Sequence, residues 1–88
     1  MNLADSVWQR IESCSGQVFH QILGKPFTYT ARGRTIRLHT TNRSISRTAI
    51  EKALVLCPLE NTTPVQHLSA PSYVYAILMD PRIRRSDW

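Results

Sequence analysis

The chain has 88 residues and is 42% hydrophobic, which fits one small globular domain and excludes a disordered tail. Its formal net charge is +5, and its two cysteines exclude the class of small secreted domains that many disulfides hold together. The sequence has neither an apolar stretch of about 20 residues nor the basic and then apolar start of a signal peptide, so we expect a single cytoplasmic domain over residues 1–88, with no membrane partner.

The first predicted element is a helix that starts near Asp5 or Ser6, because either side chain can cap the free amides of a first turn. Gly16 is expected to stop this helix. Its apolar stripe, at helical spacing, comprises Val7, Trp8, Ile11 and Cys14. Residues 17–23 fit a helix and a short strand equally well, and Gly24-Lys25-Pro26 ends whichever of the two forms.

Residues 27–39 alternate between apolar and polar side chains, which predicts a β-hairpin around a two-residue loop, Arg32-Gly33. That loop pairs Ala31 with Arg34, Tyr29 with Ile36 and Phe27 with Leu38. Five of these six side chains are apolar or aromatic, so we expect their shared face to lie on the core. The opposite, polar face holds Thr28, Thr30, Thr35, Arg37 and His39.

The second helix has the clearest predicted start in the chain. Ser46 can cap it, and Ile45 and Ile50 are placed to form a hydrophobic staple around that cap. The buried face follows at the spacing of one helical stripe, and Pro58 is expected to end the helix. That face comprises Ile50, Ala53, Leu54 and Cys57.

Residues 60–71 are rich in Asn, Thr, Pro and Ser and predict a loop, with Val65 and Leu68 as its anchors. A third helix from about Ser72 to Met79 has almost no polar face and is expected at the centre of the core, and Asp80-Pro81 stops it. These elements predict an α+β fold, a small single domain in which a β-hairpin, with or without a third short strand, packs against two or three α-helices.

The charges are segregated along the chain. Between Ser13 and Ile50 lie six basic residues and no acidic one, so this segment has a formal charge of +6 and the remaining residues sum to −1. The basic residues are mostly Arg, whose planar fork matches phosphate and carboxylate groups. Such a basic segment indicates a nucleic-acid-binding surface, although a solvated face that keeps the protein soluble is the simpler alternative.

The predicted binding surface combines the hairpin tip, the polar face of the hairpin and the loop that enters the second helix, whose N-terminus attracts phosphate. Its Arg side chains would contact phosphates, and its amide and hydroxyl groups would hydrogen-bond to the nucleic-acid backbone. A recognition helix and a two-stranded ribbon are both compatible with this surface. The predicted residues are Arg32, Arg34, Arg37, His39, Asn42, Arg43, Ser44, Ser46 and Arg47.

We therefore expect a small, basic, non-enzymatic bacterial module that binds nucleic acid, with DNA favoured over RNA. One alternative is a protein-interaction module or homodimer that docks on an acidic partner. A second is a small ribonuclease, in which His39 would transfer a proton and Arg37 would stabilise the phosphorane. The cysteines and histidines lack the short paired spacings of zinc sites, so we expect no metal, and no cofactor motif is present.

Overall fold

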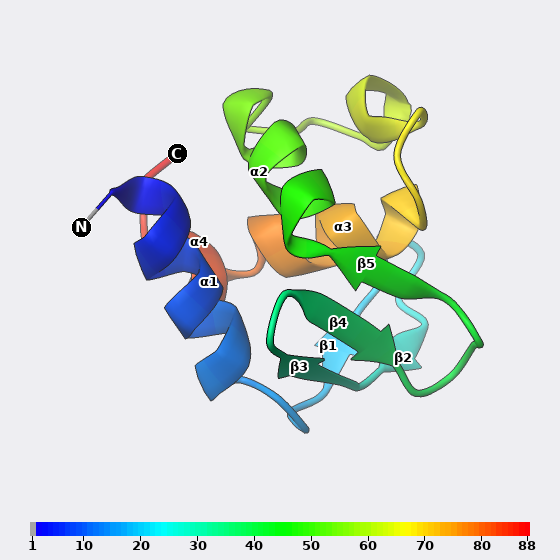
Figure 1. The fold of residues 1–88 in the computed structure, drawn as a ribbon. Helices are drawn as coiled ribbons and strands as arrows, with labels where there is room; N and C mark the ends of the chain where they lie inside the picture. The colour runs from blue at the N-terminus through cyan, green and yellow to red at the C-terminus, as the bar shows by residue number, and fades with distance from the viewer. Residues whose placement is uncertain (1) are drawn as a thin grey trace.

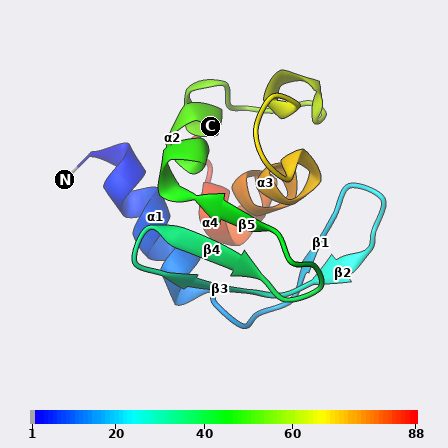
Figure 2. The same ribbon diagram turned by 45° about the vertical axis from the view of Figure 1, so that its right-hand side comes forward.

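In a computed structural model, which describes residues 2–88, the chain forms two small antiparallel sheets and a set of helices packed on one side of the larger sheet (Figures 1 and 2). The elements are α1 (Leu3–Ser13), β1 (Phe19–His20), β2 (Pro26–Phe27), β3 (Tyr29–Arg32), β4 (Thr35–Leu38), β5 (Ser44–Ser46), α2 (Arg47–Val55), the 3₁₀ turn η1 (Thr63–Val65), α3 (Pro71–Met79) and α4 (Pro81–Arg84). One sheet pairs β1 with β2, and the other has the strand order β3-β4-β5. The predicted α+β class is confirmed. The further short strand that residues 17–23 allowed is present as β1, whereas β5 lies in a segment that was predicted to be a loop before the second helix.

Helix α1 begins earlier than predicted. The side chain of Asn2 accepts a hydrogen bond from the backbone amide of Asp5 at 2.9 Å, so Asn2 is the cap, and the expected start at Asp5 or Ser6 is wrong. Asp5 instead lies in the first turn, where its negative charge is favourable beside the helix dipole. The predicted apolar stripe is buried, as expected.

The ambiguous segment 17–23 contains a strand. Phe19 lies opposite Phe27 in the β1–β2 pair, and both side chains are buried. Gly24, with φ of +89°, turns the chain between the two strands. A short segment with balanced local preferences has therefore become a strand because this conformation buries Phe19 in the core.

The hairpin of β3 and β4 has a different register from the predicted one. Tyr29 pairs with Leu38 and Ala31 with Ile36, so the two-residue loop is Gly33-Arg34. The loop begins with a positive φ of +63° at Gly33, which is the requirement of a type II′ turn, whereas the predicted loop needed a positive φ at an arginine. The register differs by two residues, so the two faces keep their polarity, but Arg34 is in the loop and not on the apolar face.

Strand β5 and helix α2 are continuous. Ser46 ends the strand and caps the helix, since its hydroxyl accepts a hydrogen bond from the amide of Ala49 at 3.1 Å. Ile45 and Ile50 on either side of the cap are both buried, as the predicted staple requires. The helix ends at Val55, before the proline that was expected to stop it.

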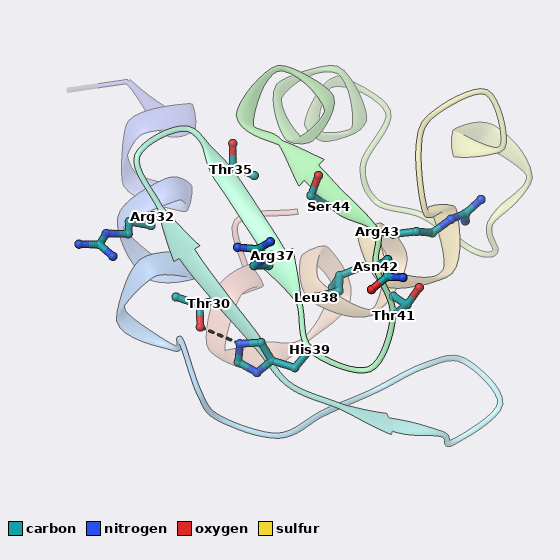
Figure 3. Close-up of a pocket in the computed structure, with 10 residues that line it drawn as sticks. All are labelled: Thr30, Arg32, Thr35, Arg37, Leu38, His39, Thr41, Asn42, Arg43 and Ser44. Carbon is teal, nitrogen blue, oxygen red and sulfur yellow. Dashed lines mark hydrogen bonds between the residues drawn. The ribbon is translucent and has the colours of Figure 1, made fainter.

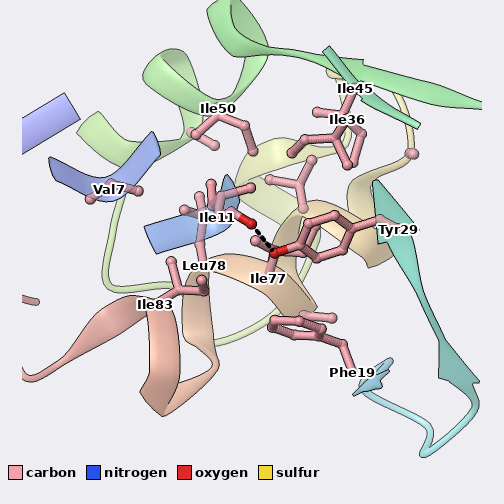
Figure 4. Close-up of a cluster of buried hydrophobic side chains, with 14 of the residues drawn as sticks. Val7, Ile11, Phe19, Tyr29, Ile36, Ile45, Ile50, Ile77, Leu78 and Ile83 are labelled. Carbon is pink, nitrogen blue, oxygen red and sulfur yellow. Dashed lines mark hydrogen bonds between the residues drawn. The ribbon is translucent and has the colours of Figure 1, made fainter. Parts of the chain in front are cut away.

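The core is built around α3, whose Val74, Ala76, Ile77 and Leu78 are buried as predicted. The hydroxyl of Tyr29 donates a hydrogen bond of 2.7 Å to the carbonyl of Ile11 inside this core, and burial raises the pKa of that hydroxyl (Figure 4).

Helix α3 ends at Met79, so the predicted stop at Asp80-Pro81 is confirmed, but a further short helix follows it. The side chain of Asp80 accepts a hydrogen bond from the amide of Arg82 and caps the short helix α4, which the sequence did not indicate. Trp88 then packs back, and its indole donates a hydrogen bond to the carbonyl of Leu78 at 2.9 Å. None of the helices in residues 2–88 has the length and apolar composition to span a membrane.

The cap of α2 has a measurable consequence. Replacing Ser46 with alanine is expected to lower the free energy of unfolding by about 1 kcal/mol, because the amide of Ala49 loses its acceptor. Urea denaturation followed by circular dichroism measures this loss. Ser44→Ala is the matched control, since Ser44 is on the same exposed face of β5 and caps no helix. Equal stability of the two variants would contradict a capping role.

Candidate nucleic-acid interface

The solvent-exposed face of the three-stranded sheet is polar on all three strands. The register places Thr30, Arg37 and Ser44 in one row across the strands. It places Arg32, Thr35 and Ser46 in the next row. All six side chains are exposed, whereas the alternate residues Tyr29, Ile36, Leu38 and Ile45 are buried on the other face. The alternation seen in the sequence therefore produces one continuous face of hydroxyl and guanidinium groups.

A shallow hollow of about 920 Å³ opens on this face, between the strands and the loop that joins β4 to β5 (Figure 3). Six of the nine predicted residues line it, namely Arg32, Arg37, His39, Asn42, Arg43 and Ser44. The structure adds Thr30, Thr35, Leu38 and Thr41 to them. Thr30 and Thr35 could have been included from the sequence, because they share the polar hairpin face with Arg37.

The three Arg side chains of the hollow are spread across it. In Figure 3, Arg37 lies over the middle of the sheet, while Arg32 and Arg43 project toward opposite sides of it. This spacing does not converge on one small anion.

These three Arg side chains make no ion pair with any of residues 2–88. The four ion pairs of the structure lie elsewhere and join Arg10 to Asp87, Arg47 to Asp5, Arg47 to Glu51 and Arg82 to Asp80. Four of the six acidic residues are thereby used away from the sheet face. No acidic side chain of residues 2–88 therefore neutralises the three guanidinium groups of the hollow.

Arg47 lies outside the hollow, although it was predicted to contact phosphate. Its guanidinium pairs with Asp5 of α1 and, at 2.9 Å, with Glu51, and it lies 5.9 Å from the ring centroid of Trp8. Hydrogen bonds to Asp5 and Glu51 raise the pKa of Arg47, which therefore stays charged but has that charge compensated. The arrangement ties α1 to α2.

Arg34 and Ser46 also lie outside the hollow, and the N-terminus of α2 is less available to a phosphate than predicted. The amide of Arg47 donates a hydrogen bond of 2.8 Å to the carbonyl of Arg34, and the Ser46 hydroxyl accepts from Ala49. Two amides of the first turn are thus already used within the protein.

His39 is held at the edge of the hollow by two hydroxyl groups. Its Nδ1 is 2.8 Å from Oγ1 of Thr28. Its Nε2 is 2.7 Å from Oγ1 of Thr30, the contact drawn in Figure 3. Both ring nitrogens therefore have neutral partners, and within residues 2–88 no carboxylate is hydrogen-bonded to the ring. Residues 2–88 also contain no group of three or more His, Cys, Asp or Glu side chains that could hold a metal ion.

Aromatic side chains do not contribute to the hollow. Trp8, Phe27 and Tyr29, which could have stacked on bases, are at most 4% exposed and belong to the core. The chemistry of the surface is therefore that of cations, hydroxyls and one amide. In comparisons with protein-family models, with curated proteins and with solved structures, nothing matches this chain.

Proposed function

We propose that this protein binds duplex nucleic acid, with DNA favoured over RNA, by laying the polar face of its three-stranded sheet against the phosphate backbone. The observation that carries the proposal is the set of unpaired guanidinium groups of Arg32, Arg37 and Arg43 around a hollow without acidic residues. Arg forks bind phosphate oxygens in two-pronged hydrogen bonds. The surrounding hydroxyls and Asn42 are suited to hydrogen bonds with the same backbone.

The absence of aromatic groups from the hollow favours a duplex over a single strand. Proteins that bind single strands stack the bases on aromatic side chains, and such stacking supplies about 1–3 kcal/mol per base. In the hollow, the guanidinium and hydroxyl groups reach a charged backbone but offer no aromatic platform to an unpaired base.

The width of the sheet favours contact across the backbone over reading of base edges. Neighbouring strands are about 4.8 Å apart, and the major groove of about 12 Å admits a helix or a two-stranded ribbon. A three-stranded sheet is wider than such a ribbon, so we expect its flat polar face to lie across the groove on the phosphate backbones. Binding is therefore expected to depend little on sequence and strongly on salt.

Fluorescence anisotropy with labelled oligonucleotides tests this proposal. Binding to a DNA duplex should weaken with salt, with a log–log slope of about −2.7, because each of three neutralised phosphates contributes about −0.9. Duplexes of different sequence should bind alike, and a single strand of the same length should bind more weakly. A stronger complex with duplex RNA would reassign the target to RNA. Tighter binding of the single strand, or no binding at about 50 mM salt, would contradict the proposal.

A further inference from the structure

The large apolar side chains that residues 2–88 leave exposed gather at two places. The first, with exposures of 51%, 49% and 93%, comprises Val18, Ile22 and Leu23. The second, with exposures of 45%, 84% and 42%, comprises Leu3, Val55 and Leu56. In Figures 1 and 2 the β1–β2 connection projects from one end of the molecule, while the start of α1 and the end of α2 lie at the other end. Clustered exposed apolar groups mark interaction sites more often than scattered ones do.

The first cluster lies on an ordered protrusion, residues 18–27, which we call the arm. At its tip the amide of Gln21 donates to the carbonyl of Lys25 at 2.9 Å, and the amide of Gly24 donates to the carbonyl of Gln21 at 2.7 Å. Leu23 is therefore presented to solvent by a hydrogen-bonded turn. An apolar side chain held in water by a formed turn gains free energy when a partner covers it.

The base of the arm is fixed to the domain by Arg82. Its guanidinium lies 3.9 Å from the ring centroid of Phe19 and donates a hydrogen bond of 2.8 Å to the carbonyl of Val18. Burial alone would raise the pKa of the Asp80 carboxyl, but hydrogen bonds from Arg82 hold that pKa below its ordinary value, so the two groups stay paired. The arm is thus held in a fixed direction, which lowers the entropic cost of docking it.

Two members of the second cluster, Leu3 and Val55, line a hollow of about 420 Å³ between the start of α1 and the outer side of α2, which we call the end groove. Its walls include Leu3, Ala4, Leu54, Val55, Arg47 and Glu51. Arg47 pairs with Glu51, which also lines the groove, and with Asp5, which does not line it. These three groups sum to −1, and we call them the negative rim of the groove. The groove therefore combines apolar walls with a negative rim at its edge, and its volume accommodates two aliphatic side chains.

Charge decides how these two sites can meet. An arm against an arm would bring Lys25 close to a second Lys25, and a groove against a groove would bring two negative rims together. Only an arm in a groove joins the apolar surfaces with opposite charges facing each other. We propose that the end groove of one copy of this protein receives the arm of a second copy, with Ile22 and Leu23 in the groove and Lys25 at its negative rim.

This contact is head to tail, so each copy keeps a free arm at one end and a free groove at the other, and the association can continue from copy to copy. The proposal does not depend on nucleic acid, because neither the arm nor the end groove belongs to the hollow on the sheet. Each site has far fewer residues than the roughly 20–30 per side of a stable interface, so we expect a weak association that depends on concentration.

Sedimentation velocity of the full chain and two variants tests the head-to-tail contact. The average mass of the wild-type protein should rise above the 10.1 kDa monomer as the concentration increases to about 1 mM. Leu23→Asp places a charge on the apolar tip of the arm, and Val55→Asp places one in the apolar wall of the groove. Each variant alone should therefore stay monomeric. An equimolar mixture should form dimers and nothing larger, because it contains one intact arm and one intact groove per pair.

Gln66→Asp, on an exposed position of the loop after η1, is the matched control and should associate like the wild type. Circular dichroism checks the fold of each variant, and the exposed positions of Leu23 and Val55 make unfolding unexpected. If Val55→Asp still dimerises, the arms pair with each other, and if Leu23→Asp still dimerises, the grooves do. Either result, or a wild type that stays monomeric throughout, overturns the proposal.

Discussion

Replacing Arg32, Arg37 and Arg43 together with alanine is expected to weaken binding to duplex DNA by at least about 100-fold at about 50 mM salt, since hydrogen bonds to charged groups contribute about 1.5–3 kcal/mol each. The salt dependence should also flatten, with the log–log slope changing from about −2.7 toward zero. Anisotropy titrations at several salt concentrations measure both changes. All three side chains are exposed and unpaired within residues 2–88, so the fold should be unaffected.

The matched control removes the same amount of charge from elsewhere. Arg34, Lys52 and Arg85 are exposed and lie outside the hollow, and their joint replacement with alanine changes the net charge by the same three units. If binding depends on where the charges lie, this variant should bind duplex DNA within about threefold of the wild type, because salt screens the effect of charges that lie far from the site. Equal losses in the two variants would mean that only total charge matters, and would contradict a binding site in the hollow.

Replacing Phe19 with alanine is expected to lower the free energy of unfolding by about 3–5 kcal/mol. The side chain is fully buried, its ring centroid is 5.9 Å from that of Phe27 and 5.2 Å from that of Tyr29, and Arg82 covers its face. A domain of this size has about 4–13 kcal/mol of stability in total, so much of the population should unfold at room temperature.

Urea denaturation followed by circular dichroism measures this loss, with Leu23→Ala as the control. Leu23 lies four residues further along the same arm and is 93% exposed, so its truncation should change the stability by less than about 0.5 kcal/mol. A Phe19→Ala variant that loses less than about 1 kcal/mol would show that the β1–β2 pair does not belong to the folded core.

Several features follow from the sequence because their causes are local. Ser46 begins α2 because a hydroxyl three residues before Ala49 can accept its amide, and that relation needs no distant partner. The polar and apolar faces of the β3–β4 hairpin follow from strict alternation, and they survive an error of two residues in the register. The segregation of charge is also visible in the sequence, and six of the nine residues predicted from it line the hollow.

The tertiary structure alone decides which Arg side chains remain unpaired. Arg43 and Arg47 are the same type of residue and only four positions apart, so the sequence does not distinguish them. Arg47 nevertheless forms an ion pair with Asp5, which is 42 residues away in the chain. Arg43 forms no ion pair with any carboxylate within residues 2–88. The strand at Phe19 is likewise set by its packing on Phe27 and Tyr29. Caps, turns and periodicity act over about four residues, so they fix the local elements and faces. Pairing between distant groups depends on which elements pack together, and only the folded chain determines it.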